Sequence, residues 1–366
     1  MATIMMISPK DNNFYNFRRE LIEKLVENKY EVYLVCPYGE KMDYFIKKGC
    51  KFIDLTIDRR GTNPIKDLQQ IRFYVGILKK FKPNIVLTYT TKCSTYGGIA
   101  CRLTKTKYIV NNAGLIDTST YSWWLRIILD TLYRLGFRKA SCMMYQNSQE
   151  QDYMNSLLRN KIKCHCIPGS GVNTTEFSYQ PYPDESVITF NYVARIVKIK
   201  GIEEFLECAK RIQAEYPKSR FIIYGDYDED EYRAKIEEYI ELGYVEYGGV
   251  LLDMKPAITK SHAVIHPSYY EGMTNVVLEH SAMGRVCIGS DIPGVRDGID
   301  DGVTGFTFPC KDVDTLVETV KTFIKLPNER KEAIGRAARE KMEREFDRSI
   351  VTNIYLEEIH NQLMEN

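Results

Sequence analysis

Residues 266–279 read HPSYYEGMTNVVLE. The apolar run 263–265 just before them predicts a short buried strand, which ends at Pro267 because proline cannot donate a hydrogen bond to a strand ladder. Glu271 and Gly272 then open a turn. The sequence therefore predicts a strand followed by a loop that carries a carboxylate at its tip.

A helix is expected to follow this loop. Thr274 or Asn275 can cap it, and its apolar pattern continues through Ala282. The first amides of such a helix carry partial positive charge and bind anions or hydroxyl oxygens. Glu279 stands eight positions after Glu271, so the two carboxylates are expected to meet different parts of one ligand.

Short apolar runs alternate with helical patterns from the first residues onward. This alternation predicts βαβ units and parallel, doubly wound sheets, whose ligands bind at the carboxyl ends of the strands. The expected strands lie near residues 3–8, 31–36, 51–55, 84–88, 108–111, 140–146, 164–168, 187–193, 220–224, 244–247, 263–265, 286–289 and 305–308. Expected helices lie near 14–27, 64–81, 93–104, 121–137, 311–325, 328–345 and 348–364, and others lie between the strands of the second half.

A chain of 366 residues is too long for one ordinary hydrophobic core. A polar, proline-bearing stretch up to residue 186 follows the strand near 164–168, and we place the domain boundary at its start. The predicted fold is α/β, with two Rossmann-like domains at residues 1–170 and 171–347 that face each other across a cleft. The last helix, near 348–366, is expected to pack back on the first domain.

The loop at residues 8–13 follows the first strand, where a dinucleotide-binding domain would carry GxGxxG. That glycine pattern is absent from the loop, so the sequence argues against a Rossmann cofactor at this point.

Charge is unevenly distributed along the chain. Residues 1–170 hold 27 Lys+Arg and 14 Asp+Glu, or 27 − 14 = +13, whereas the remainder carries 23 − 35 = −12. A basic half next to an acidic half suggests an anionic partner for the first half, such as nucleic acid, a membrane surface or a phosphorylated acceptor. The alternative is chance clustering of solvated charges.

The segment 121–139 contains both tryptophans, a dense apolar stripe and several cations. A helix of this kind can lie in a membrane interface, with its rings at headgroup depth and its cations toward anionic lipid. The alternative is an ordinary core helix. The residues expected to make the peripheral membrane contact are Trp123, Trp124, Arg126, Arg134 and Arg138.

The ten cysteines are scattered without CxxC pairs, which favours reduced thiols in a cytoplasmic protein. The N-terminal residues 1–8 lack a basic region and a cleavage site, so we interpret them as a first strand. No apolar run approaches the roughly 20 residues that span a bilayer. We expect a cytoplasmic protein that lies peripherally at the inner face of the cell membrane, with no metal site.

Seven motifs carry a resemblance to a known family. In the second half they lie at 191–196 with 200–202, 247–250, 271–279, and 290–297 with 301–306; in the first half they lie at 17–21, Thr91-Lys92 and 168–172. Taken together they resemble the family 4 glycosyltransferases, which are retaining enzymes with two Rossmann-like domains (the GT-B type), and the resemblance covers nearly the whole chain. The first-half set resembles the branch that builds capsular, O-antigen and related surface or glycoprotein glycans on lipid-linked carriers.

The resemblance implies a nucleotide-sugar site in the second domain. Arg195 and Lys200 are expected on the donor diphosphate, where their charges can stabilise the leaving group without a metal ion or cofactor. Glu271 is expected on the donor-sugar hydroxyls, so that Glu271, Arg195 and Lys200 carry the reaction. Glu279 is expected on the ribose, because a carboxylate can accept two hydrogen bonds from a vicinal diol.

The other donor contacts are implied in the same way. The amides of Gly272, Met273, Thr274 and Asn275 are expected to help hold the sugar and the phosphate, and Tyr247, Val250 and Leu251 to lie along the base. The family picture is a same-face attack in which the leaving phosphate helps to deprotonate the acceptor, so we predict no dedicated catalytic base.

The acceptor side departs from the family pattern in two places. The loop after the first strand lacks the usual glycines and carries Asn12 and Asn13, and asparagines stand at 111–112 where a histidine is common. Lys92 matches a lysine of the related branch and could meet an acceptor phosphate; otherwise it caps or solvates a helix start. The acceptor-side candidates are Asn12, Asn13, Lys92, Asn112 and Gly114.

The sequence thus predicts a retaining transferase that moves a sugar from a nucleoside diphosphate, UDP being the expected carrier, to a lipid-pyrophosphate-linked saccharide. Three alternatives remain: a nucleotide-sugar epimerase of the same fold, a non-catalytic nucleotide-sugar-binding protein, and a nucleic-acid binder. We find no recognised nucleic-acid module. His165, His262, His266, His280 and His360 are interpreted as structural or surface residues.

Overall fold

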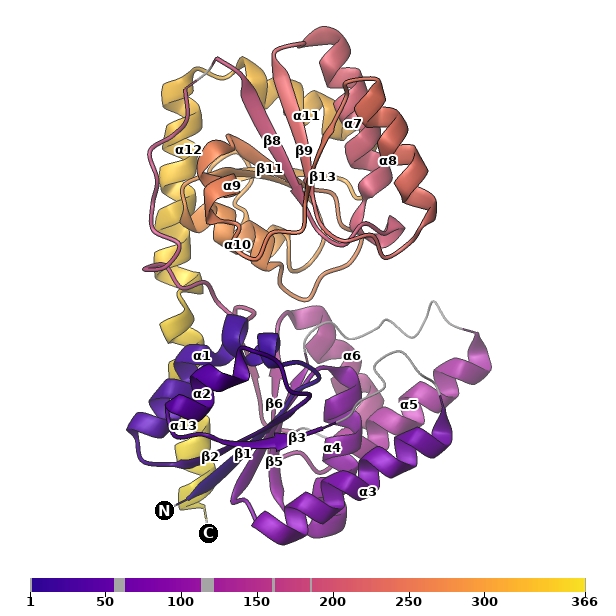
Figure 1. The fold of residues 1–366 in the computed structure, drawn as a ribbon, viewed down its shortest axis with the longest axis vertical. Helices are drawn as coiled ribbons and strands as arrows, with labels where there is room; N and C mark the ends of the chain where they lie inside the picture. The colour runs from indigo at the N-terminus through magenta and orange to yellow at the C-terminus, as the bar shows by residue number, and fades with distance from the viewer. Residues whose placement is uncertain (1, 56–62, 113–121, 160–161, 185, 366) are drawn as a thin grey trace. The chain divides into compact units, whose positions relative to one another are not determined.

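The computed structural model describes residues 2–55, 63–112, 122–159, 162–184 and 186–365. The chain divides into two compact units (Figure 1). The first unit holds Met1–Ser170 together with Ser349–Asn366, and the second holds Gly171–Arg348. The chain therefore passes from one unit to the other twice.

A parallel sheet of seven strands forms the centre of the first unit. Three neighbouring strands of this sheet, at residues 3–7, 31–36 and 85–89, are buried apolar runs, which is typical of parallel sheets covered on both faces. The sheet order is β3-β2-β1-β4-β5-β6-β7. The strands are β1 Thr3–Ile7, β2 Glu31–Cys36, β3 Lys51–Asp54, β4 Ile85–Tyr89, β5 Lys107–Asn112, β6 Cys142–Tyr145 and β7 Cys164–Cys166.

Helices cover both faces of this sheet. Ile4 and Met6 point into one core with α1, α2 and α13, whereas Met5 and Ile7 point into the other with α3, α4, α5 and α6. This follows from the alternation of side chains along a strand. The helices are α1 Asp11–Glu27, α2 Met42–Lys47, α3 Pro64–Phe81, α4 Thr91–Thr104, α5 Trp123–Phe137, α6 Ser148–Leu158 and α13 Arg348–Met364.

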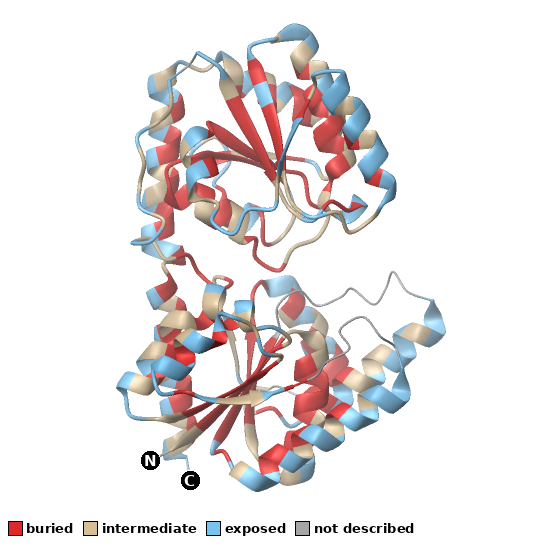
Figure 2. Ribbon diagram, viewed as in Figure 1, coloured by how far each residue is buried: buried red, intermediate tan, exposed pale blue. Residues whose placement is uncertain are grey.

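A second parallel sheet, of six strands, forms the centre of the second unit. Figure 2 shows its middle strands largely buried, between helices that each have a buried and an exposed face. Its order is β10-β9-β8-β11-β12-β13. The strands are β8 Ile188–Val193, β9 Ser219–Tyr224, β10 Glu246–Gly249, β11 Ala263–His266, β12 Val286–Ser290 and β13 Gly305–Phe308. The helices are α7 Ile202–Glu215, α8 Glu231–Glu241, α9 Lys255–Lys260, α10 Asn275–Ala282, α11 Val313–Lys325 and α12 Asn328–Lys341.

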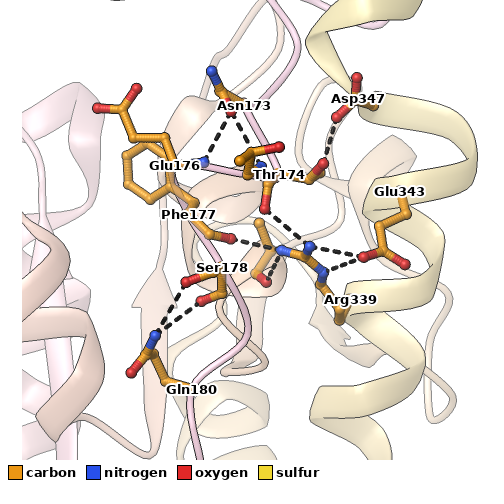
Figure 3. A network of polar contacts seen from close by, with 11 residues as sticks. Asn173, Thr174, Glu176, Phe177, Ser178, Gln180, Arg339, Glu343 and Asp347 are labelled. Atoms are coloured by element: carbon orange, nitrogen blue, oxygen red, sulfur yellow. Dashed lines mark hydrogen bonds and ion pairs between the residues drawn. The ribbon is translucent and has the colours of Figure 1, made fainter.

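The segment that enters the second unit is held against α12 (Figure 3). The guanidinium of Arg339 donates hydrogen bonds to the carbonyl oxygens of Thr174 (2.9 Å), Phe177 (2.6 Å) and Ala282 (2.7 Å). Ala282 is the last residue of α10, so this network also holds the end of the helix that carries Glu279.

Among the differences from the predicted helices, one changes the type of helix. The pattern near 328–345 predicts a continuous helix, but α12 ends at Lys341 and a π-helical turn follows at Met342–Phe346. Met342 and Phe346 are buried against α10 there, so tertiary packing sets the geometry of this turn.

Candidate functional site

The order of the second sheet reverses between β8 and β11, because β9 and β10 lie on one side of β8 and β12 and β13 on the other. The loops that leave the carboxyl ends of two such strands diverge, and ligands of open α/β sheets bind at that point. Arg195 and Lys200 follow β8, and Glu271 follows β11. The structure thus brings these predicted residues to the switch point of the sheet.

Lys200 and Glu271 contact each other directly. The Nζ of Lys200 lies 2.6 Å from Oε1 of Glu271, and both side chains are largely buried. Gly201 makes this approach possible, because its φ is +71° and a Cβ there would lie 2.1 Å from the carbonyl oxygen of Pro267. The amide of Tyr269 also donates to the carbonyl of Ile199 at 2.9 Å.

His266 is a member of this group that the sequence analysis did not include. It is the last residue of β11, its side chain is 2 % exposed, and its Nε2 lies 3.1 Å from Oε1 of Glu271. A role in the site could have been predicted from its position at the carboxyl end of a buried strand, five residues before a candidate carboxylate.

The Glu271 carboxyl is ionised at neutral pH. Burial by itself would raise its pKa, but hydrogen bonding and attraction by His266 and Lys200 outweigh burial and lower the pKa to about 2. An ionised carboxylate can only accept hydrogen bonds, which suits it to sugar hydroxyls.

The turn between Glu271 and α10 is packed tightly. A Cβ on Gly294, whose φ is +76°, would lie 2.1 Å from the carbonyl oxygen of Gly272, and the Thr274 amide donates to the Gly294 carbonyl at 3.0 Å. Thr274 occupies the N-cap position of α10, as one of the two predicted caps, but its side chain makes no capping hydrogen bond. Met273 is buried, and Asn275 is the first residue of α10.

Glu279 lies in the second turn of α10 and differs from Glu271 in protonation. Burial raises the pKa of its carboxyl to about 7, against the lowering effect of the Arg348 charge. The two carboxyls of the predicted Glu-x7-Glu pattern therefore have pKa values displaced in opposite directions.

Arg195 does not contact Glu271. Its Nη1 lies 2.5 Å from Oδ2 of Asp228, in the loop after β9, and its side chain is 58 % exposed. Tyr247 lies on the edge strand β10 and donates to the Gly225 carbonyl at 2.8 Å, while Val250 and Leu251 are exposed in the loop that follows β10. These residues belong to the same carboxyl edge of the sheet as Lys200.

The acceptor-side candidates lie at the corresponding edge of the first sheet. Asn12 and Asn13 are in the first turn of α1, Lys92 in the first turn of α4, and Asn112 at the end of β5. The strands that precede them, β1, β4 and β5, are neighbours. Lys92 forms an ion pair with Asp67 of α3 at 2.9 Å. Gly114 lies outside the described residues.

Three possible metal ligands come together in the first unit: Cys142, His165 and Glu358, whose ligand atoms lie within 4.8 Å of one another. Oε2 of Glu358 already lies 2.8 Å from Nζ of Lys163 and 3.0 Å from Nε2 of His165. These contacts tie α13 to the sheet, and we assign the group to that structural role.

Helix α5 exposes much of its apolar surface. The exposed fractions are 76 % for Trp123, 53 % for Trp124, 57 % for Ile127 and 48 % for Ile128. Arg126, Arg134 and Arg138 are also exposed on this helix or at its end. Within the part of the chain that the structure describes, no helix combines the length and the hydropathy that crossing a bilayer requires.

Comparisons with known proteins agree with this architecture. A family model described as "Glycosyl transferase 4-like" matches residues 4–147, and one described as "Glycosyl transferases group 1" matches residues 188–325. These matches confirm the resemblance that the sequence motifs indicate.

Similar relatives and structures extend over the whole chain. The N,N'-diacetylbacillosaminyl-diphospho-undecaprenol alpha-1,3-N-acetylgalactosaminyltransferase of Campylobacter jejuni is 24% identical, with 99% of each chain covered. The capsular polysaccharide biosynthesis glycosyltransferase CapM of Staphylococcus aureus is 22% identical, covering 94% of this chain and 93% of CapM. The structure of Anabaena HepE in complex with UDP superposes with a TM-score of 0.80 at 14% identity, over 99% of this chain and 100% of HepE. The predicted two-domain α/β fold is confirmed.

Proposed function

Because this chain belongs to the glycosyltransferases, with a glycosyl transferase 4-like domain followed by a group 1 domain, we propose that it moves a sugar from UDP to a saccharide held on a lipid diphosphate. The printed name of the Campylobacter relative, a diphospho-undecaprenol sugar transferase, supports this acceptor class. The UDP bound by HepE supports the donor. The name of CapM supports a place in surface polysaccharide synthesis.

The observation that carries the proposal is the Lys200–Glu271 pair at the switch point of the second sheet. An ammonium group there can neutralise a diphosphate, and a carboxylate 2.6 Å away can accept hydrogen bonds from the hydroxyls of the attached sugar. Arg195, earlier in the same connection between β8 and α7 as Lys200, supplies a second cation when it leaves Asp228.

In this proposal the protein stabilises charge and positions the two substrates. As the bond between the sugar and the β-phosphate breaks, negative charge grows on the diphosphate, and the cations of Lys200 and Arg195 stabilise it without a metal ion. Transfer proceeds with retention of configuration, and the leaving phosphate accepts the proton of the attacking hydroxyl. The residues of the first unit, Asn12, Asn13 and Lys92, hold the acceptor.

The test is release of UDP from a panel of UDP-sugars with and without a lipid-diphosphate-linked saccharide. We expect release that depends on the acceptor, and a loss of about 100-fold or more in kcat for Lys200→Met and for Glu271→Gln. Lys198→Met is the matched control, because Lys198 belongs to the same 3₁₀ turn but pairs with Glu203 and is 63 % exposed.

Two results would overturn the proposal in different ways. Conversion of the nucleotide sugar to an isomer without acceptor would indicate an epimerase. If the Lys200→Met and Glu271→Gln variants transfer sugar at the wild-type rate, the assignment of these residues to the donor site is wrong.

We propose further that the protein lies peripherally on the cytoplasmic face of the membrane through α5. Exposed tryptophans and isoleucines next to arginines suit the interface of an anionic bilayer, with rings among the headgroups and cations near lipid phosphates. This placement suits an acceptor whose lipid part stays in the membrane.

A further inference from the structure

His266 is a buried residue next to the proposed site, and the polar side chains Asn191 and His280 lie in the same part of the second unit. Its ring lies at the end of β11, and on the same face of the sheet β8 carries Asn191, which pairs with Val264 of β11. The Nδ2 of Asn191 lies 3.5 Å from Nε2 of His280, and Nδ1 of His280 bonds the Val276 carbonyl at 2.8 Å. His266 itself points its Nε2 toward Glu271.

The geometry determines which atom of His266 carries a proton. Glu271 is ionised, so it can only accept, and the 3.1 Å contact requires a proton on Nε2. Nδ1 of His266 has no hydrogen-bond partner among the described residues. The Glu271 carboxylate is therefore the one polar group of the described protein that this buried ring bonds.

Lys200 and His266 donate to the same carboxylate oxygen, Oε1 of Glu271. Both hydrogen bonds reach Oε1, and no hydrogen bond from a described residue to Oε2 accompanies them, so Oε2 remains an acceptor for a ligand. The two donors differ in mobility, because Lys200 has a long flexible side chain that is 17 % exposed, whereas His266 is 2 % exposed on a strand.

We propose that His266 is a positioning residue that holds the Glu271 carboxylate while Lys200 moves from this carboxylate to the donor diphosphate. The inference rests on the proposed function, because it assigns Lys200 to the diphosphate and Oε2 of Glu271 to the sugar. When Lys200 leaves, the bond from His266 keeps Oε1 in place, so that Oε2 stays aimed at the sugar hydroxyls.

The test compares His266→Leu, which removes the donor at similar volume, with His266→Gln, whose amide can reach the carboxylate. A hydrogen bond to a buried charge contributes about 1.5–3 kcal/mol, so His266→Leu is expected to lower kcat/KM for the UDP-sugar by about 10- to 100-fold. The affinity for UDP, which lacks the sugar, should stay within about twofold, and His266→Gln should recover most of the loss.

Two controls separate positioning from a structural role. His262→Gln replaces another buried histidine, which precedes the opposite end of β11 and bonds Thr189 and Asp184 instead of Glu271, and it should leave kcat/KM unchanged. In a Glu271→Gln background, His266→Leu should add little, because the two residues act as a unit.

The outcomes distinguish this inference from the proposed function. Active wild-type protein with an equally active His266→Leu variant overturns the inference alone, as does an equal loss of UDP and UDP-sugar affinity. Wild-type protein that transfers no sugar overturns both. If His266→Leu lowers the thermal unfolding temperature so far that it does not fold, His266→Asn, a shorter amide that cannot reach Oε1, takes its place with the same expected loss.

Discussion

At the residue scale, the candidate site contains two carboxyl groups that stand eight positions apart and whose pKa values are displaced in opposite directions. Glu271 is surrounded by donors, which lower its pKa to about 2, whereas burial raises the pKa of Glu279 to about 7. A carboxylate that is fully ionised suits contacts to a sugar at any physiological pH. A carboxyl that titrates near neutrality changes its charge, and with it its ability to donate or accept a hydrogen bond, within the physiological pH range.

Glu279 makes the stability of the second unit depend on pH. Its folded pKa of about 7 exceeds the unfolded value of 4.5, so the folded state binds more protons between these limits and stability falls as pH rises through them. Relative to Glu279→Gln, the wild-type unfolding free energy should fall by up to about 3 kcal/mol from pH 4.5 to pH 7. Urea unfolding at several pH values measures this difference.

Glu271→Gln is the control for the Glu279 experiment. The folded pKa of Glu271 lies below 4.5, so the stability that this group contributes is lost only as pH falls below that value. Between pH 5 and 7 the unfolding free energy of Glu271→Gln should therefore change with pH at the same slope as that of wild type. If the unfolding free energies of wild type and Glu279→Gln change with pH at the same slope, the raised pKa assigned to Glu279 is wrong.

At the element scale, α13 connects the end of the chain to the first sheet. Val351, Tyr355 and Ile359 pack in the same core as β1, and Asn111 at the end of β5 donates to the Tyr355 hydroxyl. The Glu358 contacts to Lys163 and His165 add a polar connection. The first unit therefore includes a helix that is separated from its other elements in the sequence by the second unit, Gly171–Arg348.

Tyr355→Ala should destabilise the first unit by about 3–5 kcal/mol, because it removes a fully buried ring and leaves a cavity. Hydrogen exchange should become faster in β4 and β5 while β11 and β12 keep their protection, as measured on peptides by mass spectrometry. Asn353→Ala, at an exposed position of the same helix, is the control. Equal acceleration in both units would show that they unfold together and that α13 is not specific to the first.

At the scale of the whole molecule, the two halves of the chain carry opposite charge, +13 for residues 1–170 and −12 for the rest. The basic half also contains α5 with its exposed tryptophans. If the protein binds an anionic surface as proposed, that surface attracts the basic half and repels the acidic half, so the charge distribution should also orient the protein on it.

Vesicles that contain anionic lipid should bind the protein more tightly than neutral vesicles, and binding should weaken as salt screens the arginines. Replacing Trp123 and Trp124 with alanine should weaken partitioning by at least about tenfold, because two large rings no longer leave water. Flotation of vesicles in a density gradient measures the fraction of protein that is bound to them.

Leu242→Ala is the matched control for vesicle binding, since Leu242 is 56 % exposed but belongs to the acidic half. Equal partitioning of wild type and the double tryptophan variant would exclude α5 as the contact.

Much of the fold follows from the sequence because its signals are local. Apolar runs of four to six residues bounded by turn residues indicate the buried strands at the centre of each sheet, and the alternation of such runs with helical periods predicts two doubly wound sheets. The same holds for the turn at Glu271 and the helix after it, since the residues that form them are adjacent in the chain.

The partners of these residues were decided only by tertiary structure. Arg195 meets Asp228, 33 positions later, because β8 and β9 are neighbouring strands, and Lys200 meets Glu271 because the sheet order places β11 beside β8. The sequence predicts only a structural or surface role for His266, since nothing in its local sequence shows which way a strand-end side chain points. Periodicity reports which face of an element is apolar, whereas strand order brings distant loops to one edge, and that order depends on packing across the whole sheet.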